Sequence, residues 1–325
     1  MRTFKWLFLL ILLASAAYVP YPRISDYIVS TGYGKCRTGG EEVILLRKFN
    51  RGNYTYYLAV SPTSLHTSVI RSDSLRFNAA TWATIGSLYA STPYIRALKQ
   101  AMYYSNPLQD AGFRHFLPSQ HGIDLTVDLC PSKRPLDRIV FADLIKELGQ
   151  VEKPVPIAIS ITGRWMDMHP GDLSWLEELV RERKLAVVWI NHSFHHFTDK
   201  NIPLKRNFLL EPGTDIKSEV LCTEIALLER NIIPSVFFRF PGLVSDTDIY
   251  DKIVNFGLIP VASDAWLAKG QKPGEGSIVL IHANGNEPVG IRDFLDLLRE
   301  EKQNVLSGRW ELFDLRESVI ADVSK

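Results

Sequence analysis

The sequence predicts an α/β protein whose larger, carboxyl-terminal part is a parallel sheet with right-handed crossover helices, closed as a barrel or left open. Three observations predict it. From residue 122 onward, short apolar strands alternate with segments of helical period. The strands are continuous apolar runs, as expected where both faces of a parallel sheet are covered. Polar side chains of catalytic type follow the strands, at the rim where parallel barrels gather their ligand-binding residues.

The elements are predicted in the following order. Residues 18–120 form a small α+β region of unknown role, with strands at 42–47 and 54–60 and a helical stretch at 82–104 that Pro93 must interrupt. In residues 121–325 the predicted strands are 123–128, 157–161, 186–190, 235–238, 258–262 and 278–281. The predicted helices are 137–149, 172–184, 215–231, 246–256 and 291–301.

The amino terminus and the composition indicate where the protein is expected to be located and which partners are not expected to bind it. Residues 1–17 combine a basic start, an apolar run from Trp6 to Leu13 and small residues, which is typical of a signal peptide. We therefore expect export to the periplasm or secretion, with an uncleaved amino-terminal anchor as the alternative. The apolar run is too short for a stable membrane span, which needs about 20 residues. The net charge of +1 gives no indication of the basic surface that binds nucleic acid.

Histidines just after a predicted strand suggest a metal site. His192 and His196 follow the apolar run 185–190 and can face the same way if the chain turns into a helical turn. Neutral imidazoles at this spacing suit a zinc-like ion. The alternative is a polar loop whose imidazoles bond to backbone or water. The pattern across the whole chain favours the metal site, because catalytic-type residues follow six successive strands: Asp128, Arg164 with Asp167, His192 with His196, Arg239, Asp264 and His282.

These segments resemble the motifs of the polysaccharide deacetylase family, the carbohydrate esterases of the NodB-homology type. The resemblance covers about residues 122–315, in the family's order, and does not extend to residues 18–120. The matching segments are Thr126-Val127-Asp128-Leu129, His192-Ser193-Phe194-His195-His196, Arg239-Phe240-Pro241-Gly242, Ser263-Asp264-Ala265-Trp266 and Val279-Leu280-Ile281-His282.

The resemblance implies a distorted or incomplete (β/α) barrel of the glycoside hydrolase and deacetylase type. It also implies a metal-dependent hydrolase that removes N-acetyl groups from an N-acetylated polysaccharide or oligosaccharide. His192 and His196 would hold one divalent metal ion, with zinc the favoured ion. Asp128 would be the general base, and Arg239 would hold it in place and ionised.

Further roles follow from the same resemblance. His282 would protonate the leaving amine, and Asp264 would keep His282 charged and oriented. Trp165, Trp266 and Arg164 are candidate substrate-binding residues, although packing in the core is the commoner use of a tryptophan.

One departure from the family affects the metal. The family has two adjacent carboxylates in its first motif, and here the second position is Leu129. Asp128 is then expected to be metal ligand and base at once, and Leu129→Asp should raise metal affinity. Alternatively Cys130, Asp167 or His169 completes the shell, or metal binding is weak or absent. Cys130 lies on the same strand face as Asp128, but a small buried cysteine is the commoner interpretation.

Two rival functions remain open at this stage. The first is a non-catalytic glycan-binding protein with a degenerate metal site. The second is an esterase that removes O-acetyl groups from a polysaccharide. Retention of Asp128, Arg239, Asp264 and His282 together favours the amide hydrolase, because a binding protein needs no acid–base set.

Overall fold

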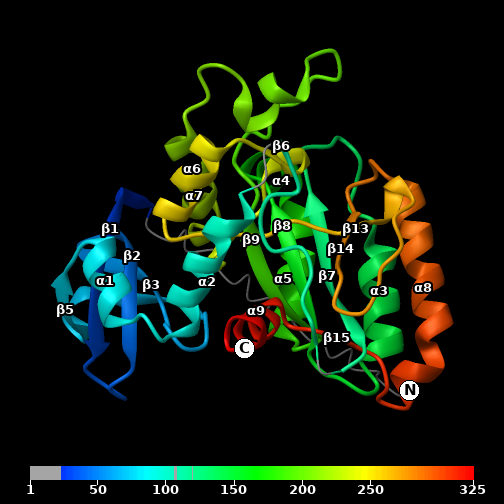
Figure 1. The fold of residues 1–325 in the computed structure, drawn as a ribbon, viewed down its shortest axis with the longest axis horizontal. Helices are drawn as coiled ribbons and strands as arrows, with labels where there is room; N and C mark the ends of the chain where they lie inside the picture. The colour runs from blue at the N-terminus through cyan, green and yellow to red at the C-terminus, as the bar shows by residue number, and fades with distance from the viewer. Residues whose placement is uncertain (1–22, 106–107, 119) are drawn as a thin grey trace, which may run out of the picture.

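The computed structural model describes residues 23–105, 108–118 and 120–325 of the 325-residue chain. It consists of an antiparallel sheet near the amino terminus and a parallel half-barrel flanked by helices (Figure 1). The expected signal peptide, residues 1–17, lies outside the described residues. No helix in the described part of the chain is both long and apolar enough to cross a membrane.

The amino-terminal sheet has five antiparallel strands in the order β4-β3-β2-β1-β5. Their bounds are β1 Ile24–Cys36, β2 Glu42–Arg51, β3 Tyr54–Val60, β4 Thr67–Arg71 and β5 Leu75–Ala79. Two helices follow, α1 (Trp82–Leu88) and α2 (Pro93–Ala101). Pro93 starts α2 in its first turn, where a missing N–H costs nothing, so the predicted helical stretch divides at this residue.

The structure confirms the predicted incomplete (β/α) barrel. Its strands run in the order β12-β10-β9-β8-β7-β14-β13, all neighbouring pairs are parallel, and β15 pairs with the start of β7. The bounds are β7 Gly122–Leu129, β8 Val155–Ile161, β9 Leu185–Asn191, β10 Phe237–Phe238, β12 Ile259–Pro260, β13 Ala265–Trp266, β14 Ile278–His282 and β15 Glu311–Leu312. A separate antiparallel pair joins β6 (Leu108–Gln109) and β11 (Val244–Ser245).

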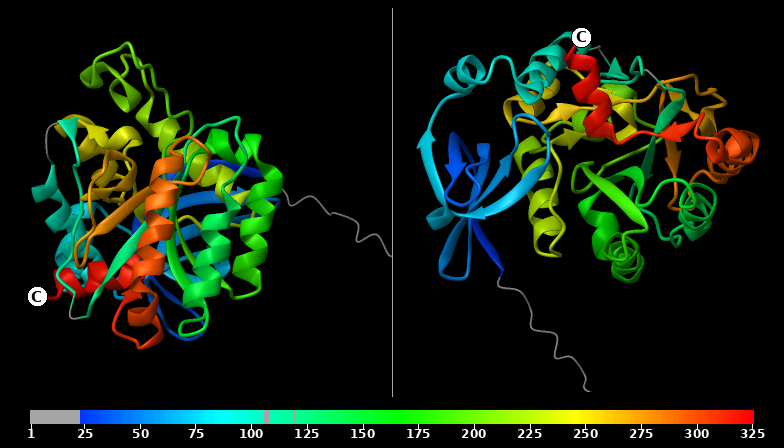
Figure 2. Two further views of the ribbon diagram at one scale, coloured as in Figure 1. Left: turned by 90° about the vertical axis from the view of Figure 1, so that its right-hand side faces the viewer. Right: turned by 90° about the horizontal axis from the view of Figure 1, so that it is seen from below.

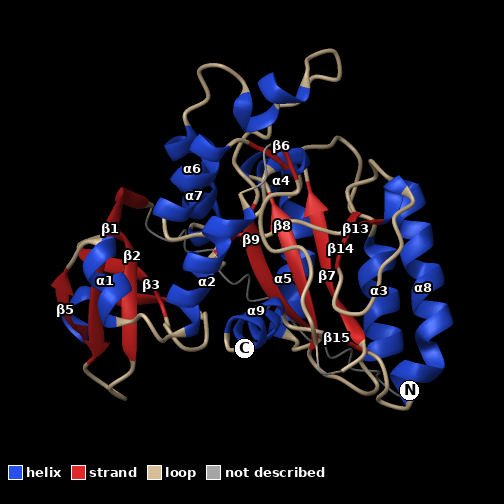
Figure 3. Ribbon diagram, viewed as in Figure 1, coloured by secondary structure: helices blue, strands red, loops and turns tan. Residues whose placement is uncertain are grey.

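Helices cover the outer face of the half-barrel, and α3 and α8 lie side by side along one edge (Figure 3). Their bounds are α3 Arg138–Leu148, α4 Gly163–Met168, α5 Pro170–Arg181, α6 Ile216–Leu228, α7 Thr247–Asn255, α8 Pro288–Leu306 and α9 Leu315–Val323. Short 3-10 helices occupy connections at Ser72–Ser74, Met102–Tyr104, Leu204–Arg206, Phe208–Leu210, Pro241–Leu243 and Leu267–Lys269.

The pleat of β7 sorts its side chains onto two faces. All eight residues of the strand are buried. Val127 and Leu129 join the core cluster beneath the covering helices, with Phe141 of α3 and Phe294 of α8 among its members. Because successive side chains point to opposite faces, Asp128 points the other way, toward the inside of the half-barrel.

A buried ion pair joins the amino-terminal sheet to a helix of the half-barrel. Arg47 of β2 donates from Nε and Nη2 to the two carboxylate oxygens of Glu224 on α6, at 2.7 and 2.8 Å. The Tyr27 hydroxyl donates to the same carboxylate at 2.9 Å, and Arg47 Nη1 donates to the carbonyl of Phe256 at 2.8 Å. Seen from below, α6 stands between the blue amino-terminal sheet and the half-barrel (Figure 2, right). The amino-terminal sheet is therefore anchored to a helix of the half-barrel.

Candidate active site

The carboxyl ends of β7, β9 and β14 bring the predicted polar residues together. His282, the last residue of β14, is the direct register partner of Asp128 in β7. Asn191 ends β9, and His192 follows it with its backbone N–H donated to the carbonyl of Ile161, the last residue of β8. Parallel strands that end at one level thus deliver their following side chains to one rim.

Cys130, His192 and His196 form a buried group that could hold a metal ion. One ligand atom from each lies within 4.8 Å of the others. Cys130 Sγ is 3.5 Å from His192 Nε2. The opposite nitrogen of His192, Nδ1, lies 2.8 Å from the carbonyl oxygen of Arg239, which assigns the proton to Nδ1 and leaves Nε2 free to bind a metal.

The donor set fits a zinc-type ion. His196 is buried, and neither of its ring nitrogens has a hydrogen-bond partner among the described residues. A buried polar group without a partner is costly, and a metal ion would satisfy it. Thiolate sulfur and imidazole nitrogen are the ligands that zinc prefers.

The charge state of Cys130 agrees with this fit. Burial opposes ionisation of the thiol. The neighbouring imidazoles of His196, His282 and His192 outweigh burial and hold the pKa of Cys130 well below its usual value. A thiolate, and not a thiol, is the species that binds metals.

This ligand group differs from the expected one. Cys130, and not Asp128, belongs with the two histidines to the group that could hold a metal ion, and Asp128 is paired with Arg239. Leu129 is fully buried in the outer core cluster. The expectation that Leu129→Asp raises metal affinity is therefore corrected, because position 129 faces away from the histidines.

Asp128 is held by a buried guanidinium. Arg239 Nη1 donates to Asp128 Oδ1 at 2.9 Å and to Thr126 Oγ1 at 2.6 Å, and Nη2 donates to the carbonyl of Ala262 at 2.8 Å. The other carboxylate oxygen, Oδ2, lies 3.6 Å from His192 Nε2. Burial alone would raise the pKa of Asp128, but the charges of Arg239, His192 and His282 outweigh it, so the pKa lies below its usual value. Asp128 is ionised at neutral pH.

Glu287, and not Asp264, lies against His282. Glu287 Oε2 is 2.8 Å from His282 Nδ1 and also accepts a hydrogen bond from Trp266 Nε1 at 2.8 Å. Burial alone would lower the pKa of His282, but Cys130, Glu287 and Asp128 together raise it well above its usual value. The protonated form of His282 is thereby favoured, with the Glu287 carboxylate as its direct partner.

Asp264 has other partners than the sequence suggested. Its Oδ2 lies 2.8 Å from Nδ1 of His115 and accepts a bond from Ser277 at 3.3 Å. The role of orienting His282, expected for Asp264, is thus filled in the structure by Glu287. Sequence reasoning missed Glu287, since nothing in its spacing marks the residue before Pro288 as part of the site.

The loop that carries the two histidines is not the helical turn that the spacing suggested. Ser193 and His196 have left-handed backbone angles, with φ of 68° and 50°, which non-glycine residues adopt at a cost. Glu219 of α6 secures this loop. Its Oε2 accepts bonds from the backbone N–H groups of Phe194 and His195, both at 2.9 Å, and its Oε1 lies 2.6 Å from His195 Nδ1. Its only sequence signal was a glutamate in the first turn of a helix.

The remaining predicted residues lie apart from the metal group. Trp165 is fully buried and its ring stacks on His169, which corrects the expectation that it binds a sugar ring. Arg164 is exposed on α4. Asp167 pairs with Arg230 at 3.0 Å, and His169 Nε2 lies 2.7 Å from the carbonyl oxygen of Ser132.

Trp266 remains at the site. Its ring centroid is 5.5 Å from that of His282, and Lys269 Nζ lies 3.6 Å above the ring. Trp266 therefore lies beside His282.

No family model matches the chain. Among solved structures, the chain is similar to a family 4 carbohydrate esterase from Bacillus anthracis, at 16% identity over 74% of this chain and 95% of that one, with a TM-score of 0.47. It is also similar to the peptidoglycan deacetylase PdaC from Bacillus subtilis, at 14% identity over 64% and 93%, with a TM-score of 0.42. A third match is a CE4 family pseudoenzyme from Bacillus anthracis, at 17% identity over 65% and 70%, with a TM-score of 0.44. The function proposed below rests on this chain's own residues.

Proposed function

We propose that the protein is a metal-dependent hydrolase that removes N-acetyl groups from an N-acetylated glycan. One observation carries the proposal. An ionised carboxylate, Asp128, and a protonated imidazole, His282, stand in register on neighbouring strands beside a buried Cys130–His192–His196 group. A base and an acid with opposite pKa shifts in one site are what hydrolysis of an amide requires.

Cys130, His192 and His196 would hold the metal ion, with zinc the ion best matched to sulfur and nitrogen ligands. When bound, such an ion supplies electrophilic polarisation of the acetyl carbonyl and lowers the pKa of water. The left-handed loop and its Glu219 anchor fix His192 and His196 before any ion arrives. The chain thereby contributes a preorganised ligand set.

Asp128 acts as general base and His282 as general acid. Asp128 accepts the proton of the attacking water, and Arg239 keeps the carboxylate ionised and oriented for this task. His282 delivers its proton to the nitrogen of the leaving amine as the carbon–nitrogen bond breaks, and Glu287 stabilises the imidazolium beforehand. The products are acetate and a free amino sugar. An amine leaves poorly without a proton, so a strongly basic His282 favours the N-acetyl substrate over an O-acetyl ester.

The test combines metal content with acetate release from N-acetylglucosamine oligomers. Cobalt-substituted protein should show the thiolate-to-metal charge-transfer band of a Cys130 ligand. Cys130→Ser should lose this band and bind metal more weakly, because a serine hydroxyl is a poorer zinc ligand than a thiolate. Cys222→Ser is the matched control, because Cys222 is a second free thiol that lies outside the metal group.

The catalytic residues are tested separately. Asp128→Asn should keep the metal and lose acetate release, and His282→Ala should lose the acid limb of the pH–rate profile. A chain that binds the oligomer without releasing acetate would support the glycan-binding rival. Release from O-acetylated but not N-acetylated sugars would support the esterase.

A further inference from the structure

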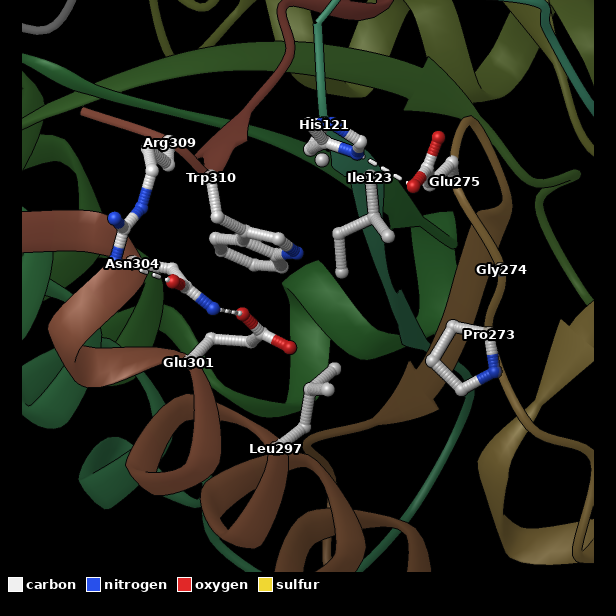
Figure 4. Close-up of a pocket in the computed structure, with 11 residues that line it drawn as sticks. His121, Ile123, Pro273, Gly274, Glu275, Leu297, Glu301, Asn304, Arg309 and Trp310 are labelled. Atoms are coloured by element: carbon white, nitrogen blue, oxygen red, sulfur yellow. Dashed lines mark hydrogen bonds and ion pairs between the residues drawn. The ribbon is translucent and has the colours of Figure 1, made fainter. Parts of the chain in front are cut away.

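A cavity lies at the opposite end of the half-barrel from Asp128. It has a volume of about 450 Å³, and its lining includes the first two residues of β7, Gly122 and Ile123, and the residues just before β14 (Figure 4). Asp128 lies six positions after Gly122 in β7, a span of about 20 Å at 3.3 Å per residue. A ligand in this cavity therefore does not reach the acid–base pair.

The cavity has an aromatic wall. Trp310 is partly buried against the barrel core and lines the cavity together with Ile123 and Leu297. In Figure 4 its indole lies between Ile123 and the side chains of Asn304 and Glu301. An indole of this kind offers a flat apolar surface to the face of a ring-shaped ligand.

Polar groups on both sides of the indole are paired with one another. Arg309 Nη2 donates to Asn304 Oδ1 at 3.1 Å, and Asn304 Nδ2 donates to Glu301 Oε2 at 2.8 Å. Across the cavity, His121 Nδ1 lies 2.5 Å from Glu275 Oε1. These pairs place carboxylate, amide, guanidinium and imidazole groups around the indole. Together these groups supply both hydrogen-bond donors and acceptors.

We infer that this cavity is a second carbohydrate-binding site, which takes one or two uncharged pyranose rings of a glycan. A pyranose has an apolar C–H face for Trp310 and a rim of hydroxyls for Glu301, Asn304 and Arg309. The volume lies within the range of small-molecule sites, about 300–1,000 Å³. Two carboxylates stand against one guanidinium and one histidine, so the lining favours an uncharged ligand over a phosphate or another anion.

The inference rests on the proposed function only in the choice of glycan. A site about 20 Å from Asp128 along β7 holds a long chain on the protein without touching the bond that is cleaved. It raises the local concentration of a polymer at the catalytic rim, as a second binding module does. Short substrates that fill only the catalytic rim gain nothing from it.

The direct test is nuclear magnetic resonance of the Trp310 indole N–H, assigned by its loss in Trp310→Phe. The probe is the tetramer of N-acetylglucosamine, added to the wild-type protein and to Asp128→Asn, in which turnover is removed. The Trp310 signal should shift saturably in both. Glu301→Ala should weaken the binding measured by this signal about tenfold or more, the equivalent of one lost polar contact to the sugar.

Glu300→Ala is the matched control, because Glu300 is exposed on the same helix and does not line the cavity. Its binding should equal that of the wild type. A Trp310 signal that does not move, or an equal loss in Glu300→Ala and Glu301→Ala, would overturn the inference.

Kinetics separate this inference from the proposed function. Trp310→Ala should raise KM for the polymer while leaving kcat, and both constants for the dimer, unchanged. If the wild type releases no acetate, the proposed function fails while the shift of the Trp310 signal still tests the cavity. If acetate is released but KM for the polymer is unaffected by Trp310→Ala, the inference is refuted and the proposed function stands.

Discussion

Replacing Glu219 by alanine is expected to weaken metal binding without removing any proposed ligand. In the structure Glu219 accepts two backbone N–H bonds from the loop between His192 and His196 and pairs with the His195 ring. That loop contains the left-handed residues Ser193 and His196, whose conformation is intrinsically unfavourable. Without the carboxylate, the loop loses the contacts that offset this cost.

The magnitude follows from the bonds that are lost. A hydrogen bond to a charged group contributes about 1.5–3 kcal/mol, so two of them amount to roughly 3–6 kcal/mol. A cavity beside Glu219, lined in part by His195 and Phe208, lets water take over some of these bonds. We therefore take the lower end, about 3 kcal/mol. This corresponds to a loss of metal affinity of about 100-fold.

The assay is competition for zinc against a chromophoric chelator. Glu219→Gln serves as the intermediate case, because its amide oxygen still accepts from both backbone N–H groups, and it should lose less than about tenfold. Lys217→Ala is the control, because Lys217 is an exposed residue on α6 close in sequence to Glu219. Wild-type affinity in Glu219→Ala would refute the reasoning.

Three further predictions concern stability and metal binding. Arg239→Met should lower the free energy of unfolding by about 3–5 kcal/mol in urea titrations, because it leaves the buried Asp128 carboxylate unpaired, and Asp128→Leu in the same chain should recover part of the loss. Leu129→Asp should lower stability without raising zinc affinity in the chelator assay, because a carboxylate at this position enters the apolar core. Burial and three nearby carboxylates raise the pKa of Glu152 to about 7, so the folded protein favours its protonated form. The contribution of this form to the free energy of unfolding is complete below pH 4.5 and is lost as pH rises through 7. The free energy of unfolding of Glu152→Gln should therefore exceed that of the wild type by about 1 kcal/mol more at pH 8 than at pH 5, a figure reduced to allow for the partial exposure of Glu152. An equal difference at both pH values would contradict this prediction.

The sequence predicted the long parallel strands and the antiparallel strands β2 and β3, but not β1, β4 or β5. Strands β7, β8 and β9 are continuous apolar runs, and burial on both faces leaves such runs little alternative. Strand β1 was not predicted, because Ile24–Cys36 mixes polar residues and glycines without a clean alternation. On one side β1 pairs with the next strand, β2, but on the other side it pairs with β5, beyond three intervening strands, which local pattern does not encode.

The residues of the candidate site likewise fall into a group that was predictable from the sequence and a group that was not. Residues that end strands were predictable, since strand direction alone brings Asp128, His192 and His282 to one rim. Glu219 and Glu287 were not, because each reaches the site from a helix or a loop whose position depends on packing. The spacing placed Cys130 on the same strand face as Asp128, but could not distinguish a candidate metal ligand from a cysteine packed in the core. The distance of 3.5 Å between Cys130 Sγ and His192 Nε2 favours the candidate ligand.

The ion pair between Arg47 and Glu224 bears on whether the half-barrel is a separable module. Glu224 is on the same helix as Glu219, five residues later, and its side chain is almost completely excluded from water. A chain truncated to the half-barrel would strip the guanidinium from this carboxylate and expose the apolar interface around it. The disturbance would fall on the helix that secures the histidine loop. The amino-terminal sheet thus supports the helix that secures the histidine loop, and a fragment that begins at Gly122, without the first 121 residues, is expected to lose metal affinity.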